Sequence, residues 1–338
     1  QENEYTVIVA DSDEVHKHTF RNCTIQDNKG EPTTTGTNPS SIISFTEGTN
    51  DEMSSVLFDE CRIIGNNGGE KGGVFYFNEC KFSPKIKNCH FENNRGDKGT
   101  CIYSNTDKFT LESSTFINND VLVNSKDGSF IFIEINTEGG KPTITGCTFT
   151  ENKQYIEAKV RGTLTLEDCT FEKYTKNSAL ILNHISSSGD EGTVYDKCNF
   201  NNNNGYIVIV ADSNEVHKHT FRNCTIKSNV GGSLDTKPPK VFSVVSITDG
   251  KTDGSVEFNS CTFSNNNCGN NGGSIYIHEC TFKPSIIDCT FDNCIGSQGS
   301  CIYSTTSKFE LEGTTFCNNK GNTQDSSFIY LDIEIKDG

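Results

Sequence analysis

The sequence has 338 residues, a formal net charge of −16, 16 cysteines and 33% hydrophobic residues. Binding to nucleic acid or anionic lipid needs a basic surface stripe, so this charge argues against DNA, RNA and anionic membranes as partners. No apolar run approaches the roughly 20 residues of a membrane span, so no membrane insertion is expected within this segment. The chain begins at Gln1 and stops at Gly338 inside a repeat, so we expect it to be a piece of a longer protein.

A short motif recurs along the chain. It contains two apolar residues followed by a Cys, with Phe or Ile two positions after the Cys and Asn five positions after the Cys. One copy consists of Val256, Phe258, Cys261, Phe263 and Asn266. Eleven copies occur, with their Cys position filled by Cys23, Cys61, Cys89, Ser114, Cys147, Cys169, Cys198, Cys224, Cys261, Cys289 and Thr314. Asn stands five positions later in nine of the eleven. Such repetition predicts a solenoid, in which each repeat packs on its neighbours.

The spacing within the motif predicts short strands separated by bends. Residues two apart in a strand share a face. The Cys follows the second apolar residue by three positions, which breaks this period and indicates a bend. The Asn is expected to make a second bend, because Asn tolerates the left-handed region. Gly-opened apolar segments such as 72–77 and 272–277 supply a third strand. We therefore predict an all-β parallel β-helix of about eleven coils, with three short strands per coil and with Phe, Cys and Asn stacked in ladders.

A longer repeat overlies the short one. Residues 5–25 match residues 206–226 at 19 of 21 positions. This offset divides the chain into a first copy, 1–204, and a truncated second copy, 205–338, with no linker between them. We expect residues 1–338 to form one continuous β-helix.

The cysteines have two interpretations. Those at the motif position are expected to be free thiols that fill space like small apolar groups, because Ser114 and Thr314 occupy the same position. Cys268 and Cys294 occur only in the second copy, at bends of adjacent coils, and are the best disulfide candidates. No Cys-x-x-Cys pair is present, which argues against zinc.

Several residues are candidates for metal binding or modification. The possible metal ligands are His16, His18, His217, His219, Asp11 and Asp13. His18 and His219 align with apolar residues of other copies, so partial burial is expected, and the aspartates lack the Gly and distal Glu of a calcium loop. We therefore expect structural histidines, an acidic turn at 11–14, and no metal or other cofactor. Asn22 and Asn223 begin Asn-Cys-Thr sequons, expected within a strand, and are glycosylation candidates.

Catalysis is not expected. Enzymes built on parallel β-helices gather carboxylates on one sheet, whereas the acidic residues here are scattered and change from coil to coil. A polysaccharide-active enzyme of the pectin-lyase type remains an alternative. A structural filament that joins end to end is another, because the outermost strands of a solenoid have unpaired edges.

The motifs resemble those of polymorphic membrane proteins, which alternate Phe-x-x-Asn with Gly-Gly-Ala followed by Ile, Leu or Val. The matching segments are 91–94, 116–119, 263–266 and 316–319, together with 72–75 and 272–275. This chain departs from the pattern in lacking the Ala and in placing Cys two residues before Phe. The resemblance implies a right-handed β-helix displayed on the surface of a bacterium or protist and involved in adhesion.

Together these features predict a non-enzymatic, extracellular or cell-surface segment that acts as a rigid stalk or adhesin. Its expected partners are a surface ligand or carbohydrate, neighbouring repeats of the same chain, or other copies of itself.

Overall fold

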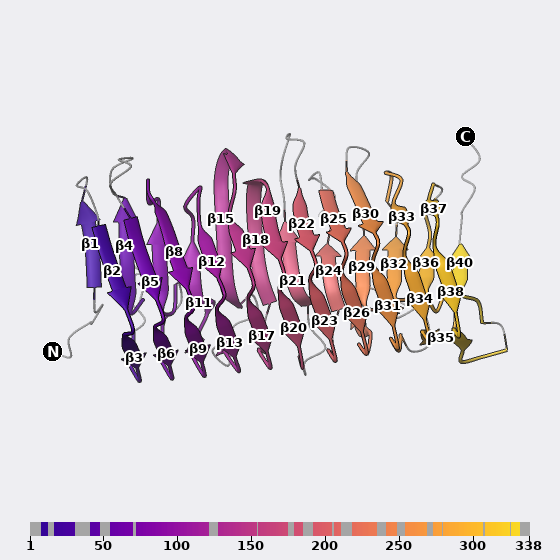
Figure 1. Cartoon of the computed structure of the whole chain (residues 1–338), viewed down its shortest axis with the longest axis horizontal. Helices are drawn as coiled ribbons and strands as arrows, with labels where there is room; N and C mark the ends of the chain where they lie inside the picture. Colours follow the sequence, from indigo (N-terminus) through magenta and orange to yellow (C-terminus); the bar gives the residue numbers. More distant parts are fainter. Residues whose placement is uncertain are drawn as a thin grey trace. The chain divides into compact units, whose positions relative to one another are not determined.

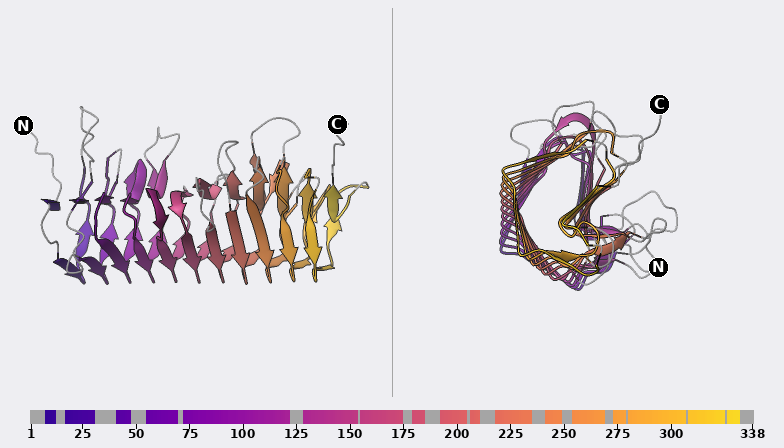
Figure 2. Two further views of the ribbon diagram at one scale, coloured as in Figure 1. Left: turned by 90° about the horizontal axis from the view of Figure 1, so that it is seen from above. Right: turned by 90° about the vertical axis from the view of Figure 1, so that its right-hand side faces the viewer.

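The computed structural model divides the chain into two compact units, Gln1–Thr165 and Leu166–Gly338, each described by itself. The described residues are 8–12, 17–30, 41–47, 55–69, 72–121, 128–153, 155–174, 179–184, 192–204, 206–210, 218–234, 241–248, 254–268, 273–278, 280–306, 308–324 and 326–331. Most of the strands are labelled in Figure 1, and Figure 2 shows them from two further directions.

Each coil of the first unit contributes one strand to each of three parallel sheets. The first sheet contains β1 (Ile8–Ser12), β4 (Ile43–Glu47), β7 (Phe75–Asn78), β11 (Lys98–Ser104), β15 (Ser129–Gly140) and β18 (Tyr155–Gly162). The second contains β2 (Lys17–Arg21), β5 (Ser55–Asp59), β8 (Ser83–Lys87), β12 (Thr110–Glu112) and β16 (Thr143–Thr145). The third contains β3 (Thr24–Gln26), β6 (Arg62–Ile64), β9 (His90–Glu92), β13 (Thr115–Ile117) and β17 (Thr148–Thr150). A short pair, β10 (Arg95–Gly96) and β14 (Asp120–Val121), follows the third sheet.

The second unit has the same three-sheet arrangement. Its first sheet contains β21 (Ala179–His184), β24 (Tyr206–Val210), β29 (Val245–Thr248), β32 (Ile275–His278), β36 (Ile302–Ser304) and β40 (Ile329–Leu331). Its second contains β22 (Thr193–Asp196), β25 (Lys218–Arg222), β30 (Ser255–Asn259), β33 (Ser285–Ile287) and β37 (Glu310–Glu312). Its third contains β20 (Thr170–Glu172), β23 (Asn199–Asn201), β26 (Thr225–Lys227), β31 (Thr262–Ser264), β34 (Thr290–Asp292) and β38 (Thr315–Cys317).

Five further strands complete the list. β19 (Leu164–Glu167) spans the boundary between the units, and β35 (Ile295–Gly296) pairs in parallel with β39 (Lys320–Gly321). β27 (Gly232–Leu234) and β28 (Val241–Ser243) form an antiparallel pair. The predicted all-β parallel β-helix with three short strands per coil is confirmed. Among the described residues no helix is long and apolar enough to cross a membrane.

Identical aromatic residues stack in the interior of each unit because the strands pair in register. Phe116 pairs with Phe91 and with Phe149 in the third sheet, and the Phe91 and Phe116 rings lie 4.5 Å apart and nearly parallel. In the second unit Phe263 and Phe291 repeat this geometry at 4.6 Å. Burying such a ring contributes about 2–3 kcal/mol, so the ladder is a large part of the core.

Each coil makes its bends with two left-handed residues, placed one before and four after the motif Cys. Those before the Cys are Asn22, Glu60, Asn88, Ser113, Gly146, Asp168, Lys197, Asn223, Ser260, Asp288 and Gly313. Those after it are Asp27, Gly65, Asn93, Asn118, Glu151, Lys173, Asn202, Ser228, Asn265, Asn293 and Asn318. The prediction that the Asn five after Cys supplies the second bend was wrong by one residue. The residue before it carries the positive φ, which turns that Asn inward.

The inward Asn residues form hydrogen-bonded ladders, unbroken from Asn66 to Asn152 in the first unit and interrupted at Cys294 in the second. Asn94 donates its backbone N–H (3.1 Å) and its side-chain amide (3.0 Å) to Asn119 Oδ1, and Asn119 donates in the same way to Asn152 Oδ1. Each side-chain amide also donates to a carbonyl of the preceding coil, as Asn119 does to Phe91 O at 3.1 Å. Buried polar groups are costly unless hydrogen-bonded, and this ladder satisfies them from coil to coil.

The motif cysteines lie at the first bend and point inward. The Cys61 thiol donates to Phe20 O of the preceding coil at 3.4 Å, and the Cys89 thiol donates to Phe58 O at 3.6 Å. Ser114, in the same position, donates to Glu112 O at 2.8 Å. All sixteen cysteines are free thiols in the structure.

The Asn ladder predicts a large penalty for truncating one amide. Asn119→Ala removes the acceptor of two Asn94 donors and leaves them buried, so we expect a loss of about 3 kcal/mol in the free energy of unfolding. Chemical denaturation followed by circular dichroism measures it. Ser113→Gly is the control, because the second copy carries Gly313 at that bend, and its expected change is within about 0.5 kcal/mol. Equal losses in the two variants would contradict a special role for the ladder.

The buried thiols predict a loss of stability in alkali. Burial raises the pKa of Cys80 and Cys89 from 9.0 to about 12. Below pH 9 both states hold the proton, whereas above it the unfolded state releases protons that the folded state keeps. Stability therefore falls as pH rises from 9 toward 12, by up to about 1.4 kcal/mol per thiol for each pH unit.

Thermal unfolding under reducing conditions between pH 7 and pH 10.5 measures this slope. Cys89→Ser, which copies the natural Ser114, is expected to make the decline shallower. An unchanged slope in that variant would show that other groups cause it.

Candidate functional site

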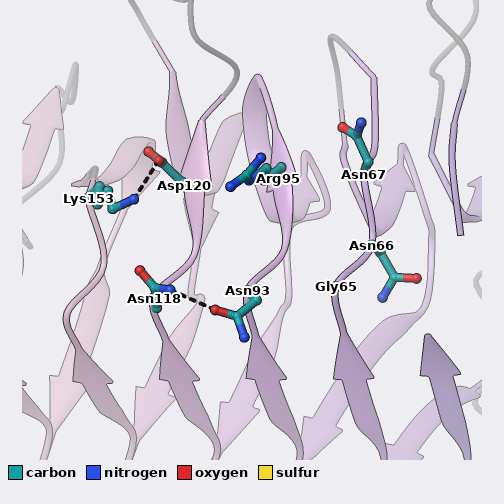
Figure 3. A pocket seen from close by; sticks show the side chains of 8 residues that line it. All are labelled: Gly65, Asn66, Asn67, Asn93, Arg95, Asn118, Asp120 and Lys153. Carbon is teal, nitrogen blue, oxygen red and sulfur yellow. Dashed lines mark hydrogen bonds and ion pairs between the residues drawn. The ribbon is translucent and has the colours of Figure 1, made fainter. Parts of the chain in front are cut away.

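A polar groove of about 320 Å³ crosses successive coils of the first unit. Its walls are formed by Gly65, Asn66, Asn67, Asn93, Arg95, Asn118, Asp120 and Lys153. Figure 3 shows these side chains in two rows, with the charged groups in one row and the amides Asn93 and Asn118 in the other. The volume lies at the lower end of the range for small-molecule sites.

The repeat itself positions the two rows. Gly65, Asn93 and Asn118 are the left-handed residues of three successive bends, and the two asparagine side chains are exposed. Two positions further on, the next outward residues form the second row: Asn67, Arg95, Asp120 and Lys153. Between the rows lies the buried ladder, represented at the groove by Asn66. The groove is therefore a consequence of the second bend.

The groove combines paired and unpaired polar groups. Asn118 donates its amide to Asn93 Oδ1 at 2.6 Å, and Lys153 Nζ lies 2.9 Å from Asp120 Oδ2. The Arg95 guanidinium is exposed and makes no ion pair or side-chain hydrogen bond with any described residue. Asn67 Oδ1 is buried and accepts no hydrogen bond within the described part of the chain. With two cations and one carboxylate, the site is slightly positive in a chain of charge −16.

This donor set suits an oxygen-rich, partly anionic ligand. A guanidinium donates two parallel hydrogen bonds to a carboxylate or similar anion, and amides both donate to and accept from hydroxyl groups. Glycoside hydrolysis requires two carboxyl groups across the scissile bond, whereas Asp120 is the one carboxylate in this lining and is held by Lys153. These residues can bind such a ligand through a guanidinium and two amides.

The second copy keeps the amides and changes the charges. Asn293 and Asn318 correspond to Asn93 and Asn118, but Asn293 donates to Asn265 Oδ1 at 2.7 Å and Asn318 donates to Asp292 Oδ1 at 2.9 Å. At an offset of 200 residues, however, Arg95 corresponds to Ile295 and Asp120 to Lys320. The recognition groups thus differ between copies on the same backbone bends.

Most of the predicted metal ligands either fall outside the described residues or are not gathered. His16, His217 and Asp13 lie outside them. Asp11 belongs to strand β1 and not to the expected turn, although its side chain is outside the described part. No cluster of three or more His, Cys, Asp or Glu suited to a metal occurs among the described residues.

The two remaining histidines lie on strands, facing the core. His18 is half-buried, pairs in register with Val56 and packs its ring 5.8 Å from Phe45. His219 pairs with Val256 and is 1% exposed. These positions agree with the alignment that placed both imidazoles in an apolar column.

The sequon residues Asn22 and Asn223 are exposed and lie at the first bend with φ near +52° and +53°, not within a strand as expected. The Asn223 amide donates to Asp196 Oδ1 at 3.1 Å. Glycosylation of the two residues stays a prediction. Cys268 and Cys294 are both buried and both free thiols, so their disulfide also stays a prediction.

Sequence reasoning missed the groove. Arg95, Asp120 and Lys153 each stand six residues after a motif Cys or Ser. The residue type at this position varies from coil to coil, so the repeat does not mark it. Because that position lies two residues beyond the second left-handed bend, placing the bend correctly would have shown it as a second outward row.

Comparison with known proteins agrees with the fold. Residues 83–237, just under half of the chain, match the family described as right-handed β-helix region. The chain is a right-handed parallel β-helix. No curated protein matches it.

Among solved structures it is similar to tailspike protein 3 of bacteriophage CBA120, with 12% identity and a TM-score of 0.40. The similarity covers 97% of this chain and 53% of the tailspike chain, so the chain spans about half the length of that protein.

Proposed function

We propose that the chain is a non-enzymatic, structural or adhesive segment of a larger extracellular or cell-surface protein, and that its groove binds an acidic carbohydrate. The observation that carries this proposal is the exposed guanidinium of Arg95, set between Asp120 and Asn67 without a partner among the described side chains (Figure 3). The resemblance to polymorphic membrane proteins supports the surface location and the adhesive role.

The arrangement of the groove matches the repeating character of a polysaccharide. Coils recur at the strand spacing of about 4.8 Å, so equivalent amides and charges line up along the groove. A sugar chain lying across the coils would present hydroxyl groups to Asn93 and Asn118 and a carboxylate to Arg95. Lys153 adds a second cation whose charge Asp120 offsets.

The rival function is a polysaccharide-active enzyme of the pectin-lyase type. Such an enzyme needs a base at the sugar ring and cations that neutralise the carboxylate. Arg95 and Lys153 supply cationic groups, which is the observation in its favour. Asp120 is the one carboxylate of this lining and is ion-paired with Lys153 at 2.9 Å, so the lining offers no unpaired carboxylate to act as that base, and this supports binding instead.

Replacing Arg95 by the residue of the second copy tests the proposal. Arg95→Ile is expected to weaken binding of oligogalacturonate or sialyllactose roughly 10- to 100-fold, because a charge-assisted hydrogen bond contributes about 1.5–3 kcal/mol. Neutral lactose is expected to bind weakly to the wild type, and Arg95→Ile is expected to change that affinity little. Isothermal titration calorimetry at low salt measures the affinities.

Arg62→Thr is the matched control. It removes the same charge from an exposed strand position of the same unit and installs the residue found at Thr262. Wild-type affinity is expected. Equal losses of affinity in both variants would show that net charge alone causes the effect. Unchanged affinity in Arg95→Ile would exclude the groove as the binding site. Cleavage of oligogalacturonate by the wild type would establish the enzyme instead.

A further inference from the structure

The charged row of the groove continues one coil beyond the groove itself. Lys29 lies six residues after the motif Cys of the first coil and pairs with Asn67 in a parallel bridge, and Asn67 pairs in the same way with Arg95. Arg95 pairs with Asp120 through β10 and β14. Figure 3 shows the last three of these side chains on neighbouring coils. In-register pairing thus fixes a row of cation, amide, cation and carboxylate over four successive coils, which we call the charge row.

Both cations of the charge row can receive a ligand. Lys29 and Arg95 are exposed, and neither makes an ion pair or a side-chain hydrogen bond with any described residue. The nearest carboxylate along the chain from Lys29 is Asp27, at the bend equivalent to Gly65, and it accepts the Gln26 amide at 2.8 Å. An ammonium and a guanidinium that are left in this way each form charge-assisted hydrogen bonds with a carboxylate.

The separation of the two cations corresponds to two sugar residues. Lys29 and Arg95 stand two coils apart, so their backbone positions lie about 10 Å from each other at the usual strand spacing. One sugar residue of an extended polysaccharide is about as long as one coil spacing. The two cations are therefore placed to bind carboxylates on two sugars that have a third sugar between them.

The other positions of the charge row do not favour additional carboxylates. Between the two cations stands Asn67, which is uncharged, so an acidic sugar at this coil meets no cation of the row. After Arg95 comes Asp120, whose carboxylate is paired with Lys153 at 2.9 Å and repels an anion placed beside it. A chain with a carboxylate on every sugar would therefore leave some of them without a cation.

The second copy keeps the alternation and changes its chemistry. The corresponding row there consists of Val230, Asn267, Ile295 and Lys320, bridged in the same order. The central amide is retained, whereas both cations are replaced by aliphatic residues, and Val230 is 47% exposed. The two positions that flank the amide change together, as expected if they contact equivalent parts of one repeating ligand.

We propose, on the basis of the function proposed above, that the charge row selects an acidic polysaccharide whose carboxylates occur on alternate sugars, with an uncharged sugar between them. Arg95 binds the carboxylate of one acidic sugar, and Lys29 binds that of the acidic sugar two residues away. The uncharged sugar lies at Asn67.

Isothermal titration calorimetry of the whole chain at low salt tests the proposal. The probes are a hyaluronan tetrasaccharide, in which two glucuronates alternate with two uncharged sugars, the hyaluronan disaccharide with one glucuronate, and tetragalacturonate, in which every sugar is acidic. We expect the tetrasaccharide to bind at least roughly tenfold more tightly than the disaccharide, because a second charge-assisted hydrogen bond forms. It is also expected to bind more tightly than tetragalacturonate.

Variants taken from the second copy make the test specific. Lys29→Val is expected to weaken binding of the tetrasaccharide roughly tenfold and to leave the disaccharide, which binds at Arg95, unchanged. Arg95→Ile is expected to weaken binding of both. Arg62→Thr is again the control for charge and is expected to change neither affinity.

The outcomes separate this proposal from the function on which it rests. Unchanged tetrasaccharide affinity in Lys29→Val, equal losses in Lys29→Val and Arg62→Thr, or tighter binding of tetragalacturonate than of the tetrasaccharide would overturn the alternating ligand. Each of these results, with binding that still depends on Arg95, would leave the groove as a site for acidic carbohydrate. Failure of all three probes to bind the wild type would overturn both.

Discussion

In-register parallel pairing is the constraint on which every other feature of this chain depends. It places each buried group against its own equivalent in the next coil, so a residue type is useful in the interior when it interacts well with a copy of itself. Phe stacks on Phe at 4.5 Å, and an Asn amide both donates to and accepts from the next Asn. A side chain that only donates would leave half of its neighbours unsatisfied, which explains why a primary amide recurs at this position.

The same constraint explains how far the sequence could be interpreted. The Phe and Asn ladders were predictable because their spacing repeats and because burial tolerates few residue types. His219 was predictable for the same reason, since it falls in a column otherwise filled by apolar residues such as Val256. The left-handed bend was misplaced by one residue, because Asn is abundant both at the bend and directly after it, as in Asn93 and Asn94.

The groove was harder to foresee, because its residues obey no ladder rule. Arg95, Asp120 and Lys153 point outward, where neighbours in the next coil need not match and composition is free to vary. Their position relative to the bend is regular, but their chemistry is not. Exposed columns of a solenoid therefore have to be located from the backbone geometry first and interpreted chemically afterwards.

The interior and the exterior of a coil consequently tolerate different kinds of change. An outward substitution such as Arg95 to Ile295 alters what a groove can bind and leaves the ladder intact. An inward one such as Asn94 to Cys294 must still meet the neighbouring coil, and the Cys294 thiol donates to Phe263 O at 3.6 Å where the Asn94 amide donates to Ile63 O at 2.9 Å. The thiol thus keeps the donation to the preceding coil and gives up the amide oxygen, so Cys294 interrupts the ladder.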